Sequence, residues 1–306
     1  MRVAISGASG LIGTALSASL RADGHEVLAL VRREARAGES RWDPARGEID
    51  ADALLACDAV VNLAGASIGD KRMTAEYKKV VRKSRTDSTG LIVSTLVAGR
   101  WGGVLMQGSA MGFYGDRGDE VLTENSHAGK TFLSDIVLAW EASAKPAVDA
   151  GIRTVFTRTG LVLAPHGGFA ERLLPLVRRG LLRRFGSGRE YHAWITLDDQ
   201  VRATRFLLES TAHDGPANIV AAHATRDQDL IAALARAAGK PATFPVPAWA
   251  MKLAAGDAAV DLLTSQNAEA GVLTRLGFSW NHATIDEAAR WVMVGAGFAP
   301  PASPSA

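Results

Sequence analysis

Three glycines near the start of the chain, Gly7, Gly10 and Gly13, constrain its fold more than any other feature of the sequence. They stand between a short apolar run, Val3–Ile5, and a helical pattern over Leu11–Asp23. Glycine at the first two positions lets the backbone turn tightly and approach a pyrophosphate, and the third lets the helix pack closely on a sheet. The helix N-terminus offers unpaired N–H groups to phosphates. Because the chain has 31 glycines, the spacing alone is weak, but the flanking strand and helix predict a dinucleotide-binding turn.

The N-terminal half alternates short β-branched runs with longer helical patterns, which is typical of βαβ units and a parallel sheet. The predicted strands are Val3–Ile5, Val27–Val31, Ala59–Leu63, Val104–Gln107 and Thr154–Arg158. The predicted helices are Leu11–Asp23, Ala75–Ala98, Ser134–Ala150 and, after glycine-rich and basic loops at Pro165–Gly168 and Gly180–Arg189, Asp199–Ser210. Right-handed crossovers then place the strands side by side, so the sequence predicts an α/β fold.

Charge and composition narrow the classes of partner and compartment. The chain has 34 basic and 32 acidic residues, and this net charge of +2 leaves no basic surplus for nucleic acid. The sequence has no uninterrupted stretch of about 18 apolar residues, so no membrane span is predicted. The single cysteine, Cys57, cannot close an intramolecular disulfide, which fits a reducing compartment and a cytoplasmic protein. The seven histidines show no His-x-x-x-His or comparable spacing, so no metal is predicted.

Two arginines, Arg32 and Arg33, follow the second predicted strand, at the position that decides which dinucleotide such a fold binds. An NAD site usually places Asp or Glu there, which accepts hydrogen bonds from the ribose hydroxyls. Guanidinium groups match a phosphate monoester in charge and geometry, so NADP(H) is favoured over NAD(H). Two solvated loop arginines would look the same in the sequence, and Glu34, one residue later, keeps NAD(H) open.

The segment after the third predicted strand, Leu63, Ala64 and Gly65, is the second candidate for cofactor contact. Its small side chains would let the backbone lie against the dinucleotide. A plain strand-to-loop connection would have a similar sequence, so both interpretations stay open.

Motifs spread over nearly the whole chain resemble the extended short-chain dehydrogenase/reductase superfamily, and within it the YfcH-like branch of epimerase family proteins. Gly7, Gly10 and Gly13 match the superfamily's Gly-x-x-Gly-x-x-Gly spacing. The earlier matching motifs of the branch are Asn62–Gly65, Ser84–Arg85 with Thr89, Gly112–Gly115, Leu122–Glu124, Phe132–Leu133 and Trp140–Glu141. The later ones are Arg158–Leu163, Gly167–Gly168, Gly186–Gly188, Trp194–Ile195, Asp198–Asp199, Val246–Ala248 and Leu276–Phe278.

This resemblance implies a Rossmann-type doubly wound parallel sheet with a smaller C-terminal substrate-side domain. We expect the NAD(P)-binding domain over residues 1–165, with later segments returning to it, the substrate-side and C-terminal module over 166–299, and a disordered tail over 300–306. The cofactor implied is NADPH. The implied cofactor contacts are Gly7, Ser9, Gly10, Leu11, Ile12, Gly13, Arg32, Arg33, Leu63, Ala64, Gly65 and Arg85. One departure is Thr196, where the branch commonly has histidine.

The superfamily's catalytic pair, Tyr-x-x-x-Lys, is absent from the sequence. In that pair the lysine lowers the tyrosine pKa, so that the tyrosine passes a proton while the nicotinamide passes hydride. The residues four positions after the three tyrosines are Val81 after Tyr77, Gly118 after Tyr114 and Ile195 after Tyr191. At the corresponding spacing the chain has Phe132 and Ile136, which carry neither a titratable proton nor a charge. Another proton donor must act, or none does.

Two hydroxyl groups are the candidate catalytic residues. Ser109 sits near the superfamily's catalytic serine and could hydrogen-bond a substrate carbonyl, or it is a turn residue. Tyr114, in a glycine-flanked loop, could supply a proton or pack as a core aromatic residue. For Glu141 we expect a structural role. The basic cluster of Arg183, Arg184 and Arg189 could receive an anion, or it is solvated surface.

Two functions fit these observations. The first is an NADP(H)-binding oxidoreductase or epimerase-like enzyme that acts on an unidentified small carbonyl or sugar-like substrate at the carboxyl ends of the strands. The second is a non-catalytic NADPH-binding sensor or scaffold, which needs no proton-transfer pair. The elaborate substrate-side region favours the enzyme. A homo-oligomer is compatible with either, because self-association is common among soluble enzymes.

Overall fold

The computed structural model describes residues 1–68, 71–185, 187–241, 243–246 and 264–299. The chain forms two compact units, each built from separate parts of the sequence. Unit 1 comprises Met1–Phe113, Lys130–Arg158 and Val201–Ala217, and unit 2 comprises Tyr114–Gly129, Thr159–Gln200 and Asn218–Ala306. The tail expected to be disordered, 300–306, lies outside the described residues.

An eight-stranded sheet organises unit 1, in the order β13-β8-β6-β5-β1-β2-β3-β4. Its strands are β1 (Arg2–Ser6), β2 (Glu26–Val31), β3 (Glu39–Asp43), β4 (Glu48–Ile49), β5 (Ala59–Asn62), β6 (Val104–Ala110), β8 (Arg153–Thr159) and β13 (Gly215–Ile219). β1 pairs in parallel with both β2 and β5, and its register brings Val3 opposite Val27 and Ala59. The pairs β2–β3 and β5–β6 are also parallel, whereas β4 runs antiparallel to β3. The strand order reverses at β1, so the carboxyl ends of β1 and β5 form the topological switch point, where sheets of this kind bind ligands.

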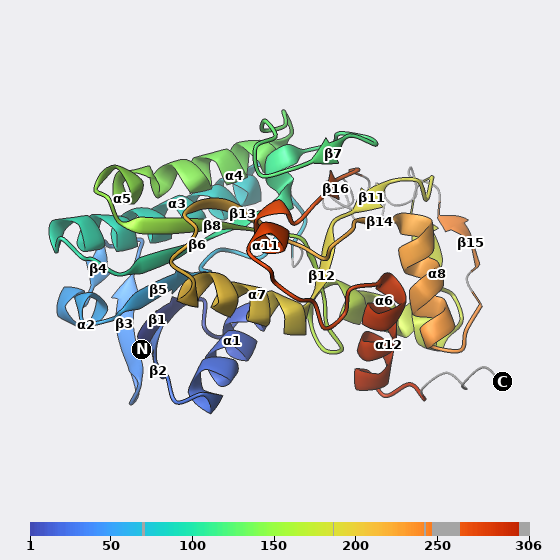
Figure 1. The fold of residues 1–306 in the computed structure, drawn as a ribbon, viewed down its shortest axis with the longest axis horizontal. Helices are drawn as coiled ribbons and strands as arrows, with labels where there is room; N and C mark the ends of the chain where they lie inside the picture. The colour runs from blue at the N-terminus through green and yellow to red at the C-terminus, as the bar shows by residue number, and fades with distance from the viewer. Residues whose placement is uncertain (69–70, 186, 242, 247–263, 300–306) are drawn as a thin grey trace. The chain divides into compact units, whose positions relative to one another are not determined.

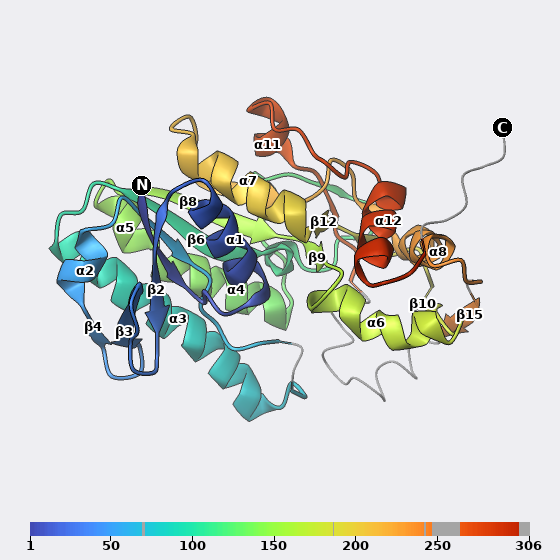
Figure 2. The ribbon, with the colours of Figure 1, turned by 90° about the horizontal axis from the view of Figure 1, so that it is seen from below.

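Helices cover both faces of this sheet (Figure 1). α1 (Leu11–Ala22) and α7 (Leu197–Glu209) lie on one face, and α3 (Ala75–Ala98), α4 (Phe132–Ser143) and α5 (Lys145–Asp149) lie on the other, as the perpendicular view also shows (Figure 2). The short helix α2 (Ala51–Leu55) precedes β5. This is a Rossmann-type doubly wound architecture, which confirms the predicted fold class. Among the described helices, none combines the length and the apolar composition that crossing a bilayer requires.

Local sequence sets the ends of the helices in unit 1. Thr74 caps α3, because its hydroxyl accepts a hydrogen bond from the Tyr77 N–H at 3.2 Å, and Thr131 caps α4 in the same way through the Ser134 N–H. The prediction of one helix over Ser134–Ala150 is wrong. Pro146, in the first turn of α5, has no N–H with which to continue α4, so two helices form.

One buried apolar cluster of unit 1 lies between the sheet and α3. Strand residues Ala4, Val60 and Leu105 are buried in one cluster with Ile92 and Leu96 of α3. Full burial of each large aliphatic side chain stabilises the fold by about 1.5–3 kcal/mol. The apolar face of α3 therefore fixes this helix against the strands whose carboxyl ends form the switch point.

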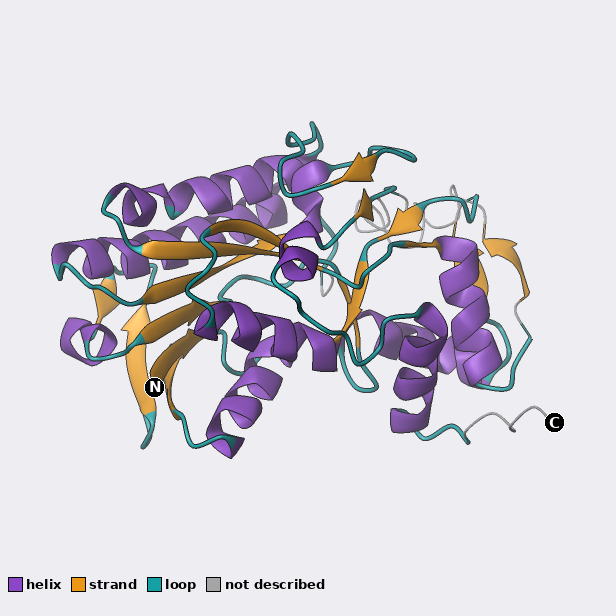
Figure 3. Cartoon of the chain, in the orientation of Figure 1, coloured by secondary structure: helices purple, strands orange, loops and turns teal. Residues whose placement is uncertain are grey.

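Unit 2 consists of shorter elements (Figure 3). They are β7 (Val121–Leu122), β9 (Leu161–Leu163), α6 (Gly168–Arg178), β10 (Arg183–Phe185), β11 (Tyr191–His192), β12 (Trp194–Thr196), β14 (Thr225–Arg226), α8 (Asp227–Ala237), β15 (Thr243–Val246), β16 (Asn267–Ala268), α11 (Gly271–Arg275) and α12 (Ile285–Gly295). Leu230 and Leu234 of α8 are buried with Val292 and Met293 of α12. The prediction of a loop over Gly180–Arg189 is partly wrong, because β10 forms there and pairs in parallel with β15.

Gly13 lets α1 approach the turn that precedes it. A Cβ atom on Gly13 would lie 2.2 Å from the carbonyl oxygen of Gly7 and 2.8 Å from the Cα atom of Ala8. A Cβ atom on Gly90, a second helical glycine, would meet nothing within 4 Å. The two glycines therefore differ sharply in what a side chain would contact.

We expect Gly13→Ala to lower the free energy of unfolding by about 1–3 kcal/mol, because the added methyl group must displace backbone. The matched change Gly90→Ala should raise it by about 0.5–1 kcal/mol, since alanine is the better helix former and has space there. Urea denaturation of both variants and the parent chain measures the two effects. Equal stability of the two variants would contradict the close approach of α1 to the turn.

Candidate functional site

The turn after β1 leaves the N-terminus of α1 open to an anion. Gly7 has a φ of +68°, a conformation that favours glycine, and a Cβ atom there would lie 2.8 Å from a carbonyl oxygen of the segment after β5. The N-cap residue Gly10 provides no side-chain cap, and the first turn of α1 has no acidic residue. The positive end of the helix dipole is therefore not neutralised by a side chain. The predicted contacts Ser9, Leu11 and Ile12 lie in this turn or at the start of α1.

Buried hydrogen bonds hold the end of β5 against the end of β1. The Ser6 hydroxyl donates to Asn62 Oδ1 at 2.6 Å and accepts from the backbone N–H groups of Leu63 and Ala64, each at 3.1 Å. The Asn62 amide donates in turn to the Thr89 hydroxyl of α3 at 2.9 Å. Because buried polar networks with satisfied partners are rigid, the backbone of the predicted contacts Leu63 and Ala64 is fixed beside the glycine turn.

The two arginines predicted to bind a 2′-phosphate have different surroundings. Arg33 donates from Nη1 to Glu39 Oε2 at 2.7 Å and from Nη2 to Glu39 Oε1 at 2.5 Å. The hydrogen bonds from the Arg33 guanidinium and the Arg36 backbone N–H lower the pKa of Glu39 to about 2. Arg32 is exposed, and no side chain in the described part of the chain pairs with it. Arg33 therefore shapes the loop, and Arg32 is the arginine better placed to receive a phosphate.

Arg85 of α3 packs against the segment after β5. Its Nη1 atom donates to the carbonyl oxygens of Ala66 at 2.9 Å and Val81 at 3.1 Å, and its guanidinium lies 5.0 Å from the ring centroid of Trp140. A Cβ atom on Gly65 would lie 3.0 Å from Arg85 Cζ. Burial lowers the pKa of Arg85 to about 10. Within the described residues its partners are carbonyl groups and a ring, so its positive charge has no carboxylate beside it.

The helix that would carry the catalytic pair is present without the pair's chemistry. α4 begins at Phe132, and Ile136, one turn later, is buried. The Phe132 ring is half-buried, and the Lys78 ammonium from α3 lies over it, with Nζ 4.6 Å from the ring centroid. Such a contact is a cation–π interaction. A cation from another helix therefore reaches the residue that stands where the resemblance assigns the tyrosine.

The Ser109 hydroxyl is buried and bonded to a carboxylate. Ser109, near the end of β6, donates to Glu141 Oε1 of α4 at 2.6 Å. Arg158 of β8 donates from Nε to the same oxygen at 2.9 Å and from Nη2 to Oε2 at 3.1 Å. The Arg158 guanidinium also lies 3.5 Å from the ring centroid of Phe113. This cluster ties β6, β8 and α4 together, which fits the structural role expected of Glu141.

Tyr114 is fully buried in unit 2, at the end of the 3₁₀ turn Met111–Tyr114. Its hydroxyl donates to Asn218 Oδ1 at 2.7 Å. Asn218 is held in turn by a hydrogen bond from its amide to the Glu269 carbonyl oxygen at 2.8 Å. Of the two alternatives for Tyr114, these contacts favour a packed core aromatic residue over a proton donor.

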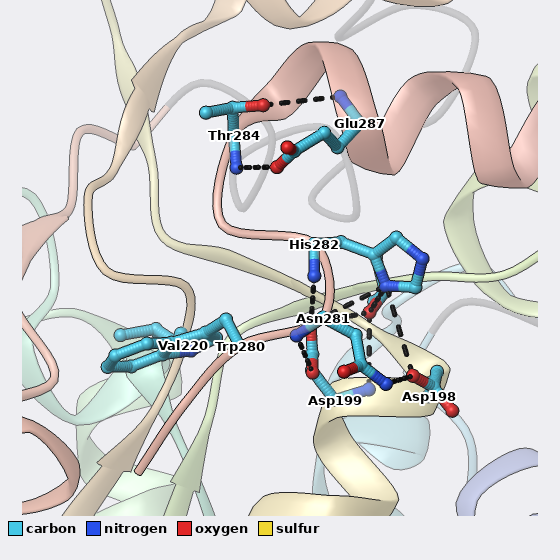
Figure 4. A network of polar contacts seen from close by, with 9 residues as sticks. Asp198, Asp199, Val220, Trp280, Asn281, His282, Thr284 and Glu287 are labelled. Atoms are coloured by element: carbon cyan, nitrogen blue, oxygen red, sulfur yellow. Dashed lines mark hydrogen bonds and ion pairs between the residues drawn. The ribbon is translucent and has the colours of Figure 1, made fainter. Parts of the chain in front are cut away.

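A polar cluster in unit 2 gathers Asp198 and Asp199, at the start of α7, with His282 (Figure 4). Their ligand-type atoms lie within 4.8 Å of one another. The Asp199 carboxylate accepts from the backbone N–H groups of Asn281 at 2.8 Å and His282 at 2.9 Å. Thr196, the departure from the branch, contacts the His282 ring through its hydroxyl at 3.2 Å. Asp199 is used to anchor the segment around residue 281, and we assign no metal to the cluster.

Three residues that shape these surroundings were not found from the sequence: Glu39, Lys78 and Arg158. Glu39 follows Arg33 by six residues in a stretch without periodic pattern. Lys78 and Phe132 are 54 positions apart, and only the run of basic residues after Lys71 signals a special role for that segment. Arg158 belongs to the matching motif Arg158–Leu163, but its ion pair with Glu141 depends on the packing of β8 against α4.

The sequence matches two family models. Residues 3–222 match the model described as the NAD dependent epimerase/dehydratase family, and residues 246–292 match a domain of unknown function, DUF1731. The first match spans well over half of the chain, so the chain belongs to the NAD-dependent epimerase/dehydratase family. This result confirms the family resemblance drawn from the motifs.

Known proteins resemble the chain over nearly its whole length. It is 42% identical to the epimerase family protein Mb2239 of Mycobacterium bovis, in an alignment covering 94% of this chain and 95% of the relative. It is 34% identical to the mouse epimerase family protein SDR39U1, covering 87% and 90%. A crystal structure of the human epimerase family protein SDR39U1 (isoform 2) with NADPH superposes with a TM-score of 0.87 at 28% identity, covering 96% of this chain and 99% of that one.

We expect the Glu39 carboxyl to titrate near pH 2, well below its ordinary value of 4.5, because Arg33 and the Arg36 N–H stabilise its charged form. The folded-state pKa lies below the unfolded one, so the stabilisation is present above about pH 4.5 and is lost as the pH falls towards 2. NMR titration of the side-chain carboxyl measures the value. Arg33→Gln should move it towards 4.5, whereas Arg36→Gln keeps the backbone donor and should change it little. A parent-chain value near 4.5 would show that the pair does not form in solution.

Proposed function

We propose that the chain is an NADP(H)-binding oxidoreductase or epimerase-like enzyme that acts on a small carbonyl or sugar-like substrate. The observation that carries the proposal is the glycine turn at the N-terminus of α1, which has no side-chain cap and no acidic residue in its first turn. Family membership and the NADPH of the human relative support the same assignment.

The turn fits a dinucleotide because side chains are excluded from it. A Cβ atom on Gly7 or Gly13 would lie within 3 Å of backbone atoms, so the chain keeps its main-chain N–H groups accessible to a pyrophosphate. The backbone of Leu63 and Ala64 and the Arg85 guanidinium would lie along the same cofactor. When bound, the nicotinamide supplies or accepts a hydride.

Arg32 supports NADP(H) as the preferred form. It is exposed at the carboxyl end of β2, where a 2′-phosphate would lie in this fold. Arg33 is engaged by Glu39, so it supports the loop instead of presenting its donors to the ligand. In this division of roles one guanidinium binds the phosphate and the other fixes the loop that presents it.

The chain's own proton chemistry differs from that of the wider superfamily. Phe132 and Ile136 cannot transfer a proton. Ser109 stays the catalytic candidate in unit 1, because it lies near the carboxyl end of β6, but it must turn away from Glu141 before it can donate to a substrate oxygen. Tyr114 would have to leave Asn218 in the same way. We therefore expect slow or atypical hydride transfer.

A second candidate function is a non-catalytic NADPH-binding sensor or scaffold. It is favoured because the Ser109 hydroxyl is bonded to Glu141 and the Tyr114 hydroxyl is bonded to Asn218. Such a protein would use the nucleotide to order its loops for a protein partner. A pull-down with and without NADPH separates the two functions, because a plain enzyme has no nucleotide-dependent partner. Oxidation of NADPH by a member of a broad carbonyl panel would instead support the enzyme.

We expect Arg32→Ala to weaken NADPH binding by about 30-fold and to leave NADH binding within about twofold. The loss of one charge-assisted hydrogen-bonding group costs about 2 kcal/mol, and only NADPH carries the 2′-phosphate. Fluorescence titration of the reduced coenzymes measures both affinities.

The matched control is Arg36→Ala, which removes an exposed arginine of the same loop and should change neither affinity by more than about twofold. An equal loss for NADPH and NADH in Arg32→Ala would contradict the role of Arg32. Failure of the parent chain to bind either coenzyme would overturn the proposed function itself.

A further inference from the structure

The Arg85 guanidinium is held in place by neutral groups. Its Nη1 atom donates to the carbonyl oxygens of Ala66 and Val81, and its Cζ atom lies 5.0 Å from the centroid of the Trp140 ring. The side chain is half-buried, and burial lowers its pKa to about 10, so it stays charged at neutral pH. In the described part of the chain no carboxylate contacts the guanidinium. Its positive charge is therefore not neutralised by any of these neighbours.

Trp140 fixes this charge beside two neighbouring strands. Its indole Nε1 donates to the Thr89 hydroxyl at 3.2 Å, and a Cβ atom on Gly108 of β6 would lie 2.8 Å from its Cζ2 atom. A Cβ atom on Gly65, after β5, would lie 3.0 Å from Arg85 Cζ. The guanidinium therefore lies beside the segment that leaves β5, and its aromatic partner packs on β6 near the carboxyl end of that strand.

The order of the strands indicates which half of the coenzyme this charge would meet. In the proposed function the pyrophosphate lies at the start of α1, after β1, and the 2′-phosphate lies at Arg32, after β2. On the other side of β1 the sheet continues with β5 and then β6. A dinucleotide crosses such a sheet at the point where the strand order reverses, so its nicotinamide half would lie over β5 and β6. Arg85 is on that half of the site.

The reduced and oxidised coenzymes differ in charge at the nicotinamide. The ring is neutral in NADPH and positively charged in NADP⁺, whereas the phosphate groups are the same in both. Like charges repel more strongly in a partly buried site than in water, because the effective dielectric constant is lower. A guanidinium without a carboxylate beside it therefore disfavours the oxidised ring and leaves the reduced ring unaffected.

We propose that Arg85 selects the oxidation state of the coenzyme, because its charge makes the chain bind NADPH more tightly than NADP⁺. The inference rests on the proposed function, since it requires the coenzyme to lie across this edge of the sheet. In an enzyme, such selection favours reduction of the substrate and release of the oxidised coenzyme. In a sensor, it makes the occupied state report the reduced coenzyme.

The test compares three ligands by calorimetry on the full chain: NADPH, NADP⁺ and 2′-phospho-ADP-ribose, which has the same phosphate groups and no nicotinamide. We expect the parent chain to bind NADPH about tenfold more tightly than NADP⁺, or better. Arg85→Met removes the charge and should bring the two affinities within about twofold of each other. Arg85→Lys keeps the charge and should retain the preference. The matched control Arg82→Met removes an exposed arginine of the same helix and should leave the preference within about twofold of the parent value.

The outcomes separate the inference from the proposed function. If Arg85→Met weakens the binding of all three ligands equally, the guanidinium binds phosphate groups, and the inference is wrong while the proposed function stands. The same holds if the parent chain binds NADPH and NADP⁺ equally, or if Arg82→Met changes the preference as much as Arg85→Met does. If the parent chain binds neither coenzyme, the proposed function fails and this inference fails with it. Arg85→Gln, which still offers a hydrogen-bond donor to a carbonyl oxygen, replaces Arg85→Met if the latter unfolds.

Discussion

The close approach of α1 to the turn after β1 is the constraint on which the rest of unit 1 depends. A side chain at Gly13 would overlap the Gly7 carbonyl, and one at Gly7 would overlap the segment after β5. Only glycine at both positions lets β1, α1 and the end of β5 meet at one place. The Ser6–Asn62 hydrogen bond then fixes this place, and Thr89 connects it to α3. A surface made mostly of backbone results, and the positive end of the α1 dipole lies beside it.

The sequence lacks the Tyr-x-x-x-Lys pair of the wider superfamily, and Phe132 and Ile136 of α4 stand where the resemblance places that pair. α4 begins at Phe132, and it is held by the Thr131 cap and by the burial of Ile136. The hydroxyl of Ser109 donates to Glu141, and Arg158 donates to both oxygens of the same carboxylate. At the start of α4 the Lys78 ammonium lies over the Phe132 ring. Family membership thus fixes the fold and the class of cofactor more firmly than it fixes the reaction.

Features coded by local pattern were predictable from the sequence. The bounds of α3 were predicted without error, because apolar spacing and its threonine cap act within the helix itself. β3 was missed, since its charged residues hide a short strand at the sheet edge. α6 was missed because Pro175 lies inside it and two glycines precede or begin it.

In the candidate site, too, features coded by local sequence were predictable and contacts between distant residues were not. The residues of the glycine turn lie close together in the sequence, and Arg32 and Arg33 are adjacent to each other. The chemistry of each segment could therefore be predicted. Glu39 pairs with Arg33, and this contact could not be predicted from the sequence. The contact between Lys78 and the Phe132 ring depends in the same way on the packing of α3 against α4. Contacts between residues distant in sequence leave no periodic trace, so the structure was needed to find them.

A crystal structure of the chain grown with NADP⁺ tests the central claim most directly. The account predicts pyrophosphate oxygens within hydrogen-bonding distance of backbone N–H groups at the start of α1, and the 2′-phosphate on the Arg32 guanidinium with Arg33 still on Glu39. A pyrophosphate bound away from this turn, or a 2′-phosphate that leaves Arg32 in solvent, would contradict it.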